Sequence, residues 1–284
     1  MNIAITGATG FIGGHLLREL AATPHTLAVI TRPSSPTPTL PARVTALPFD
    51  LTGAGADAFA RLGSPDLLIH LAWGALGDFQ SPAHMTDELP LHFNFLRALV
   101  TGGLPRLVVV GTCFEYGLQN GGLSEDAPCD PVTWYGLAKL SLLRQLQLLQ
   151  RAHPFELLWP RLFYLHGDGQ PRNSIHAQLM RAIAAGDREF PMSAGEQLRD
   201  YLPVTEVARL LARLATSPAT GVVNVCSGRP VSLRRQVETW IAERGASIVP
   251  LLGRYPYRDY EPLAFWGSTR RLQTLLPPAG EKKR

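Results

Sequence analysis

The sequence contains very little lysine. Lysine occurs only at Lys139, Lys282 and Lys283, so 24 of the 27 basic residues are arginines. The arginines are scattered and form no basic run, which argues against a nucleic-acid-binding protein. Because most surface positions tolerate either cation, a single lysine in the body of the chain indicates a site that needs a compact ammonium group.

Cysteine is also scarce, and long apolar runs are absent. Cys113, Cys129 and Cys226 have neither metal-ligand spacing nor an even number, which fits a reducing compartment and gives no metal site. No apolar run approaches the roughly 20 residues that span a bilayer. Met1 leads directly into a β pattern, without a basic segment or a cleavage site. We therefore expect a globular cytoplasmic protein with no membrane partner.

Short apolar runs alternate with amphipathic stretches in the first two-thirds of the chain. This alternation predicts a parallel sheet with crossover helices, whose strands are apolar because both faces are covered. The predicted strands are Asn2–Thr6, Thr26–Ile30, Val44–Leu47, Leu67–Leu71, Leu107–Val110 and Glu156–Leu158. The predicted helices are Phe11–Ala22, Ala54–Leu62, Glu88–Val100 and Tyr135–Arg151. Pro, Ser and Thr residues predict a loop at Arg32–Pro41.

The pattern changes after Arg161. The later predicted elements are helices at Ile175–Ala185, Val204–Ala215 and Ser232–Arg244, a strand at Gly221–Val225, and an aromatic-rich segment at Tyr255–Trp266. We expect an α/β fold in which residues 1–165 form a Rossmann-type, doubly wound parallel sheet, with residues 204–227 returning to it. Residues 166–284 mainly form a small C-terminal substrate-binding lobe at the carboxyl ends of the strands, where open α/β sheets bind ligands.

A glycine-rich segment joins the first predicted strand to the first predicted helix. It consists of Gly7, Ala8, Thr9, Gly10, Phe11, Ile12 and Gly13. Glycines here allow a tight turn, close approach of the backbone to a pyrophosphate, and close helix–strand packing. The helix N-terminus adds free amides for the phosphates. An ordinary turn can contain glycines too, but strand, turn and helix in this order predict a dinucleotide site.

The end of the second predicted strand bears on the choice between NAD and NADP. An acid there binds the adenosine ribose of NAD, whereas an arginine accommodates the phosphate of NADP. This strand ends at Arg32 without an acid, which favours NADP(H) and leaves NAD as the alternative; Arg32 could also be a solvated loop residue. Asp50 and Leu51 follow the third strand and are expected near the adenine, although Asp50 also suits a plain turn.

Tyr135 and Lys139 are four residues apart, so their side chains are neighbours on one helix face. A nearby cation favours the phenolate form of a tyrosine, whose pKa is otherwise near ~10, and lets it exchange protons near neutral pH. Surface pairs often have this spacing, but Lys139 is the only lysine before the C-terminal tail. Thr112 ends the fifth strand, where its hydroxyl could bind a substrate oxygen or merely the backbone.

Together these motifs resemble the extended short-chain dehydrogenases/reductases, the NAD-dependent epimerase/dehydratase group that acts on nucleotide sugars. The resemblance extends from residue 2 to about 272 and rests on the glycine pattern, the Tyr135/Lys139 pair, His70-Leu71-Ala72, and Thr112 four residues before Tyr116-Gly117. It implies that Tyr135 is the acid/base, that Thr112 positions the reacting oxygen, and that Lys139 tunes Tyr135 and binds the nicotinamide ribose. It also implies that Leu71, Ala72 and Trp73 line the cofactor.

Departures from the family pattern narrow the predicted reaction. Dehydratases of the family carry an acidic pair after the threonine, where this chain has Cys113 and Phe114. Epimerases that invert next to a ketone carry a cysteine at the position of Phe114. The reactions of the family that are left are reduction of a 4-keto sugar and 4-epimerisation. Because a reductase consumes NADPH whereas an epimerase retains its cofactor, usually NAD, Arg32 favours the reductase.

The resemblance is looser in the second half of the chain. Arg199 and Arg258 match the family's two arginines for the substrate diphosphate, which guanidinium groups bind bidentately. Either could instead be an ordinary surface residue. Tyr164 replaces the asparagine that usually contacts the substrate, and Asn173 is the candidate that compensates.

The sequence therefore predicts an NADPH-dependent reductase of a nucleotide-linked 4-keto-6-deoxy sugar. The resemblance further implies a homodimer through the helices Glu88–Val100 and Tyr135–Arg151. The first alternative is a nucleotide-sugar 4-epimerase with tightly bound NAD. The others are a reductase of non-nucleotide carbonyls, which the two arginines disfavour, and a non-catalytic NADP-sensing protein, which the intact Thr112, Tyr135 and Lys139 disfavour.

Overall fold

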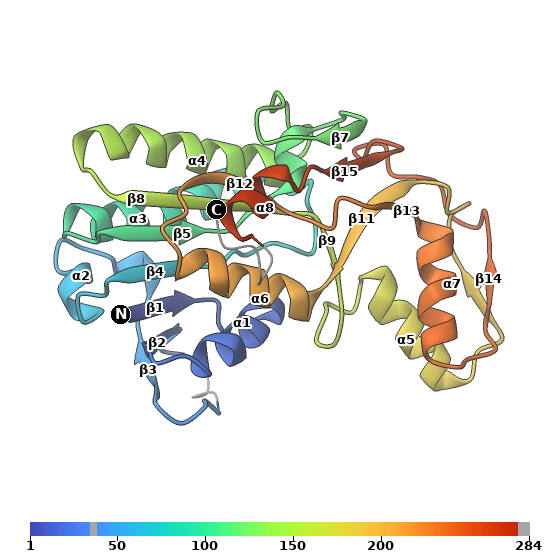
Figure 1. Cartoon of the computed structure of the whole chain (residues 1–284), viewed down its shortest axis with the longest axis horizontal. Coiled ribbons are helices and arrows are strands. Elements are labelled where there is room, and N and C mark those ends of the chain that lie inside the picture. Colours follow the sequence, from blue (N-terminus) through green and yellow to red (C-terminus); the bar gives the residue numbers. More distant parts are fainter. Residues whose placement is uncertain (35–38, 278–284) are drawn as a thin grey trace.

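The computed structural model describes residues 1–34 and 39–277. Its largest feature is an eight-stranded sheet in the order β3-β2-β1-β4-β5-β8-β12, with β6 also paired to β8 (Figure 1). All its strand pairs are parallel. The strands are β1 Asn2–Thr6, β2 Thr26–Thr31, β3 Val44–Pro48, β4 Leu67–His70, β5 Arg106–Val109, β6 Gly111–Thr112, β8 Glu156–Leu162 and β12 Gly221–Val225. The strand order reverses at β1 and β4, as in a Rossmann fold, which confirms the predicted fold class.

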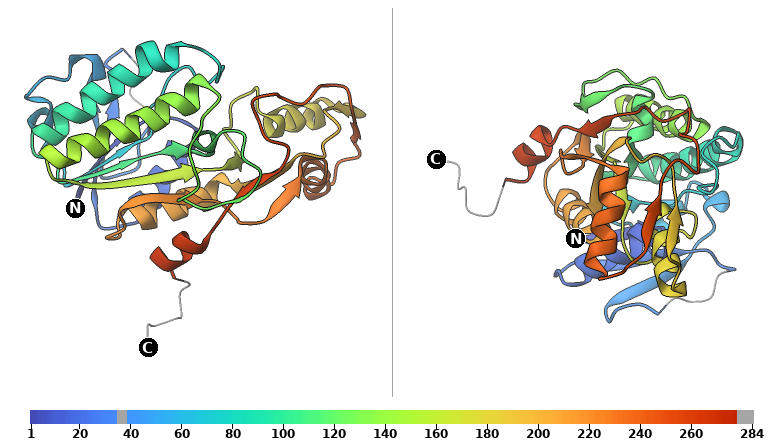
Figure 2. Two further views of the ribbon diagram at one scale, coloured as in Figure 1. Left: turned by 90° about the horizontal axis from the view of Figure 1, so that it is seen from above. Right: turned by 90° about the vertical axis from the view of Figure 1, so that its right-hand side faces the viewer.

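Helices cover both faces of this sheet. Helices α1 (Phe11–Ala21) and α6 (Val204–Ala215) pack together on one face, and α3 (Leu89–Thr101) and α4 (Trp134–Ala152) lie side by side on the other (Figure 2). Each helix has its apolar residues on the side that faces the sheet. Those of α1 and α6 belong to one buried cluster, and those of α3 and α4 belong to another on the opposite face. A π-helix at His84–Glu88 leads into α3.

One predicted helix is wrong in its extent. Instead of a helix over Ala54–Leu62, the chain forms a 3-10 helix at Leu51–Gly53 and a short α2 at Ala58–Arg61. Gly55 accounts for the late start of the helix, because glycine weakens a helix through its large conformational freedom. The predicted loop Arg32–Pro41 includes residues 35–38, which lie outside the described residues.

The C-terminal part forms a smaller lobe beside the sheet (Figure 1). Its strands form the sheets β13-β11-β9 and β10-β14. Its elements are β9 Tyr164–His166, α5 Ile175–Ala185, β10 Glu189–Pro191, β11 Leu198–Pro203, β13 Pro230–Ser232, α7 Leu233–Glu243 and β14 Val249–Leu251. Leu179, Phe190, Val237 and Trp240 belong to its own buried core. After the lobe the chain returns to the larger part, where β15 (Phe265–Gly267) pairs with β7 (Gly121–Leu123) and α8 (Arg270–Leu275) follows.

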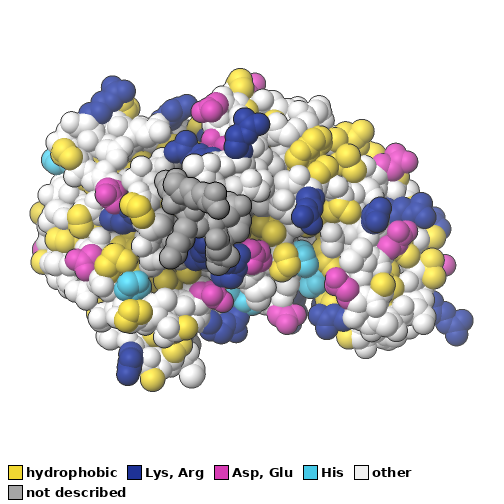
Figure 3. Space-filling model, viewed as in Figure 1, with side chains coloured by type: hydrophobic (Ala, Val, Ile, Leu, Met, Phe, Trp, Pro, Cys, Tyr) yellow, Lys and Arg dark blue, Asp and Glu magenta, His cyan; other side chains and the backbone are white. Residues whose placement is uncertain are grey.

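The surface agrees with the sequence composition. On the face shown in Figure 3, basic side chains are dispersed and lie among acidic ones. Within residues 1–34 and 39–277, no helix is both long enough and apolar enough to cross a bilayer.

Two adjacent glycines in α1 have different surroundings. A Cβ atom on Gly13 would lie 2.1 Å from the carbonyl oxygen of Gly7 and 2.6 Å from Cα of Ala8. The nearest such atom to a Cβ on Gly14 would be 3.9 Å away. The turn that joins β1 to α1 is therefore closed by Gly13 and not by Gly14.

We expect Gly13→Ala to lower the free energy of unfolding by about 1–3 kcal/mol, because the added methyl group overlaps backbone atoms. Gly14→Ala is the matched control and should be neutral or stabilising by up to about 1 kcal/mol, since alanine favours a helix. Urea denaturation of both variants measures the difference. Equal effects of the two substitutions would contradict this account of the turn.

Candidate active site

The glycine turn leaves the start of α1 open for a phosphate group. Gly7 has φ of 70°, and a Cβ there would lie 2.7 Å from the amide nitrogen of Ala72. The amide of Gly10 donates to the carbonyl of Gly7 at 3.0 Å, and α1 begins at Phe11. Thr9 and Gly10 are exposed, while Phe11 and Ile12 are half-buried. The tight turn and the exposed helix start fit the pyrophosphate of a dinucleotide.

The predicted adenosine end has two exposed side chains. Arg32 follows β2 and is exposed. Asp50 caps the 3-10 helix Leu51–Gly53 by accepting a bond from the amide of Thr52 at 3.0 Å. That backbone hydrogen bond holds the pKa of Asp50 below its usual value. Asp50 therefore acts as a turn residue, which was one of its two expected roles. Its contact with adenine stays a prediction.

Thr112 lies at the end of β6, next to a buried ion pair that the sequence analysis missed. Glu115 accepts bonds from the amide of Thr112 at 2.9 Å and from Nε of Arg161 at 2.6 Å. The hydroxyl of Thr112 accepts from the amide of Phe114 at 3.3 Å, which completes a capping box. The Thr-x-x-Glu spacing could have predicted this cap, whereas no local pattern identifies Arg161 as the partner.

Tyr135 lies against aromatic rings from three segments. Its ring stacks on Phe79 at 5.1 Å between centroids and contacts His84 at 5.2 Å, Phe114 at 6.2 Å and Trp73 at 6.3 Å. Burial, followed by the charge of Glu115, raises the pKa of Tyr135 above its usual value, and interaction with the Thr112 side chain opposes the rise. Without a bound cofactor, the phenol is therefore protonated and can donate.

The start of α4 packs closely against the backbone of Phe114, and this contact places Tyr135 among the aromatic rings. A Cβ on Gly136 would lie 2.6 Å from the carbonyl oxygen of Phe114, so only glycine permits the contact. Thr133 caps the helix by accepting from the amide of Gly136 at 3.0 Å.

Lys139 lies one turn further along α4 and is 3% exposed. Its Nζ donates to the carbonyl of Val110 at 2.9 Å and lies 4.1 Å from the centroid of the Trp73 ring. Burial lowers the pKa of Lys139 to about 7, although the charges of Glu115 and Glu88 oppose this shift. The structure thus places Lys139 in a buried environment, and its predicted role beside Tyr135 stays a prediction.

A chain of buried hydrogen bonds links β1, β4 and α3. Thr6 Oγ1 lies 2.8 Å from His70 Nδ1, and His70 Nε2 lies 2.9 Å from His92 Nδ1. His92 Nε2 lies 3.0 Å from Glu88 Oε2. We call Thr6, His70, His92 and Glu88 the histidine chain. No sequence motif pointed to it.

One set of proton positions satisfies the histidine chain. Burial lowers the pKa of both His70 and His92, and the hydrogen bond from His92 lowers the pKa of Glu88. The Glu88 carboxylate therefore accepts from His92 Nε2, neutral His92 accepts from His70 Nε2, and neutral His70 accepts from the Thr6 hydroxyl.

The two predicted diphosphate arginines share one carboxylate. Glu261 accepts from Nη2 of Arg199 at 2.9 Å, from Nη1 of Arg258 at 3.3 Å and from the hydroxyl of Tyr164 at 2.8 Å. The Arg199 side chain is 4% exposed, whereas that of Arg258 is 58% exposed. The structure brings both arginines together, but Arg199 is already paired with Glu261, which the sequence analysis did not identify.

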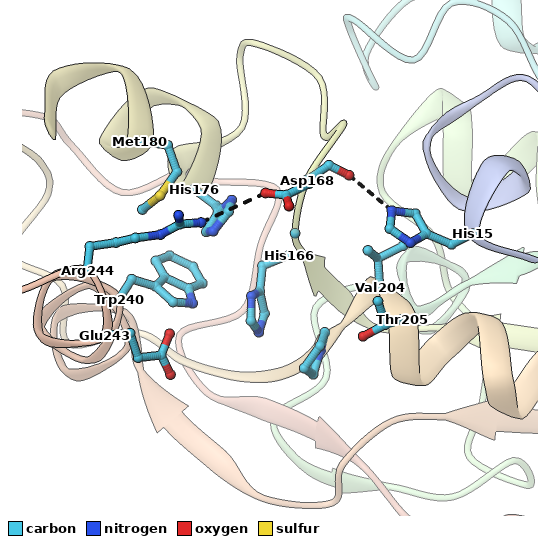
Figure 4. Close-up of a pocket in the computed structure, with 12 residues that line it drawn as sticks. His15, His166, Asp168, His176, Met180, Val204, Thr205, Trp240, Glu243 and Arg244 are labelled. Atoms are coloured by element: carbon cyan, nitrogen blue, oxygen red, sulfur yellow. Dashed lines mark hydrogen bonds and ion pairs between the residues drawn. The ribbon is translucent and has the colours of Figure 1, made fainter. Parts of the chain in front are cut away.

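Asn173 and the lobe histidines lie apart from these groups. Asn173 is exposed just before α5, and its carbonyl accepts from the side chain of Gln178 at 2.8 Å. His166 and His176 line a cavity of about 240 Å3 between α1 and the lobe (Figure 4). Both rings pack on Trp240, and burial lowers the pKa of His166 to about 4. None of Thr112, Tyr135 and Lys139 lines this cavity.

The comparisons with known proteins identify the family to which this Rossmann-type chain belongs. The model of the NAD dependent epimerase/dehydratase family matches residues 3–226. The protein belongs to this family, and the predicted resemblance is confirmed.

Individual relatives are consistent with this membership. The dTDP-6-deoxy-L-talose 4-dehydrogenase (NAD(+)) of Aggregatibacter actinomycetemcomitans is 32% identical over 276 residues, which cover 94% of this chain and 100% of that protein. The GDP-6-deoxy-D-mannose reductase of Pseudomonas aeruginosa is 28% identical and covers 84% of this chain and 78% of its own. The structure of MoeE5 in complex with UDP-glucuronic acid and NAD is 26% identical with a TM-score of 0.83, covering 97% of this chain and 92% of that chain.

The neutral histidine chain predicts a loss of stability in acid. Because the folded pKa values of His70 and His92 lie below 6.5, the unfolded chain binds more protons between the two values. Stability is therefore full above about pH 6.5 and falls below it, by at most about 1.4 kcal/mol per pH unit for each histidine. Urea midpoints from pH 8 to 5 should decline, and less steeply for His92→Gln. An equally steep decline in that variant would contradict the assignment.

Proposed function

We propose that this protein is an NAD(P)-dependent oxidoreductase that interconverts a ketone and an alcohol at carbon 4 of a nucleotide-linked 6-deoxy sugar, with NADPH-dependent reduction as the leading direction. The names of the two relatives described above, a 4-dehydrogenase and a reductase, both specify nucleotide-linked 6-deoxy sugars. Thr112, Tyr135 and Lys139 are the catalytic set.

The observation that carries this proposal is the environment of the two residues after Thr112. Cys113 is buried, and burial raises the pKa of its thiol, so it stays protonated. Phe114 contacts the rings of Tyr135 and Tyr260. Neither residue supplies the acid and base that elimination of water needs, which favours hydride exchange alone.

The side chains suit reduction of a carbonyl group. A bound nicotinamide supplies or accepts the hydride at the sugar carbon. Tyr135 gives its phenolic proton to the oxygen in the reductive direction and takes it back in oxidation. Because the Thr112 oxygen already accepts from the amide of Phe114, its hydroxyl hydrogen is the part that can turn from the Tyr135 oxygen to the substrate oxygen. Lys139 lies one helical turn from Tyr135 and carries the positive charge that stabilises the phenolate formed.

The substrate diphosphate is assigned to Arg258 and Arg199, with Arg258 as the accessible partner. Asn173 is exposed before α5 and remains the proposed contact for the sugar. A homodimer through α3 and α4 is part of the proposal, and it is supported by exposed apolar side chains of α4, since Trp134 is 42% and Leu148 60% exposed.

Tyr135→Phe should lower turnover by about 10²–10⁴-fold, because the phenylalanine cannot transfer a proton. Its affinity for NADPH should stay within about twofold of the wild type, since the ring that packs on Phe79 is retained. Oxidation of dTDP-6-deoxy-L-talose and reduction of the corresponding ketone measure turnover in both directions. Tyr255→Phe, at an exposed tyrosine, is the control. Near-normal turnover in Tyr135→Phe would refute the catalytic assignment.

Arg32→Ala should weaken NADPH binding about tenfold or more and leave NADH binding unchanged, because a charged hydrogen bond to the 2′-phosphate is lost. Fluorescence titration of the purified, cofactor-free protein measures both affinities. Arg235→Ala, at an exposed position of α7, is the control. Equal affinity of the wild type for NADPH and NADH would argue against Arg32 as a phosphate-binding residue.

The second candidate function is a nucleotide-sugar 4-epimerase. A UDP-glucose 4-epimerase of Azospirillum brasilense is 26% identical and covers 84% of this chain. An epimerase has to keep its cofactor through both half-reactions. NAD that remains bound during purification, together with inversion at carbon 4 without net oxidation, would establish the epimerase in place of the reductase.

A further inference from the structure

Both ends of the histidine chain hold the backbone beside Trp73. The amide of Ala72 donates to Thr6 Oγ1 at 3.3 Å, and the amide of Gly74 donates to Glu88 Oε2 at 2.7 Å. The residues on either side of Trp73 are therefore bonded to opposite ends of one buried network. A network of this kind resists change, because each unpaired buried group would cost free energy.

The indole of Trp73 is held by two further histidine contacts. Its ring stacks on His92 with 4.7 Å between centroids and an interplanar angle of 13°. Its Nε1 donates to Nδ1 of His84 at 3.1 Å, and His84 is itself fully buried. Backbone, ring face and ring nitrogen are thus all fixed, which gives this large side chain one orientation.

The ammonium group of Lys139 lies over the face of the same indole, with Nζ 4.1 Å from the ring centroid. An ammonium has three N–H donors, and within the described residues the hydrogen bond of Lys139 goes to the carbonyl of Val110. The electron-rich face of an indole attracts a cation, and the attraction is strongest where water is excluded. Trp73 therefore supplies a contact that the buried charge otherwise lacks.

Other charged and titratable groups also act on Lys139. Glu115 and Glu88 favour its charged form, and Lys139 in turn disfavours protonation of His70 and His92. These two histidines are neutral, so neither adds a second positive charge beside the ammonium, although His92 donates a hydrogen bond to Glu88.

We propose that Trp73 is a positioning residue for Lys139, and that His92 and the rest of the histidine chain hold the indole so that its face meets the ammonium. This inference rests on the proposed function in one respect, because it takes Lys139 as a member of the catalytic set. It assigns Trp73 a role in addition to the lining of the cofactor that the family resemblance implies.

The small number of lysines allows a direct test. Protein labelled with 13C at lysine gives signals from only three residues, Lys139, Lys282 and Lys283, and Lys139→Arg identifies the Lys139 signal. Titration of the cofactor-free protein by NMR then gives the pKa of Lys139 in wild type, Trp73→Phe, Trp73→Leu and His92→Gln. Leucine keeps the site apolar but removes the aromatic face.

Trp73→Leu should weaken proton binding by Lys139 about tenfold, a fall of about one pKa unit, because the cation loses its aromatic contact. Trp73→Phe should give a smaller fall, since a phenyl face attracts cations less strongly. His92→Gln should also lower the pKa, because the indole loses its stacking partner. His176→Gln is the matched control, since His176 is a buried histidine packed on Trp240, and should leave the Lys139 signal unchanged.

An unchanged Lys139 pKa in folded Trp73→Phe and His92→Gln would overturn the inference, even if both variants were less stable. If Trp73→Leu does not fold, those two milder variants decide the matter. The titration uses neither cofactor nor substrate, so its outcome is independent of the proposed reaction. A chain inactive on nucleotide sugars could still show the predicted shifts, and an active reductase could fail to show them.

Discussion

The carboxylate of Glu115 joins the elements that carry the candidate catalytic groups. It accepts from the amide of Thr112 on β6 and from the side chains of Trp159 and Arg161 on β8. The Glu115 side chain is 0% exposed and that of Arg161 is 2% exposed. Loss of one partner from a buried ion pair typically costs about 3–5 kcal/mol, so this pair reinforces the backbone pairing of β6 with β8. Because Glu115 binds both the Thr112 amide and Arg161, the ion pair helps to fix the position of the Thr112 hydroxyl.

Helix α4 positions the other two candidate catalytic residues relative to Thr112. Gly136 allows the helix to approach the backbone of Phe114, and this contact brings Tyr135 to the Thr112 side of the sheet. Helix geometry then places Lys139 one turn away, where Val110 and Trp73 receive its ammonium. The three groups are thus held by backbone packing and buried polar contacts, with aromatic rings from outside α4 enclosing the phenol.

Local patterns in the sequence predicted more of the fold than of the site. The bounds of Ile175–Ala185 and Gly221–Val225 agree with the structure, because each is a clear periodic or apolar run. The predicted helix Ala54–Leu62 was too long because Gly55 near its start outweighed its apolar spacing. Contacts such as Glu261 with Arg199 and His70 with His92 join residues 62 and 22 positions apart. Such pairs depend on tertiary packing, so no local motif identifies them.

The carboxylate of Glu261 occupies the two arginines that are proposed to bind the substrate diphosphate, so binding of an anion by both would be an exchange. A ligand that binds both Arg199 and Arg258 has to replace an internal anion that both already contact. The free energy of binding is then the difference between the ion pairs that the arginines form with the ligand and those that they form with Glu261. A singly charged ligand gains little free energy from this replacement. A doubly charged ligand is attracted to the two arginines more strongly than the Glu261 carboxylate is. Under the proposed assignment, the charge of a ligand would contribute to selection independently of the contacts with its sugar.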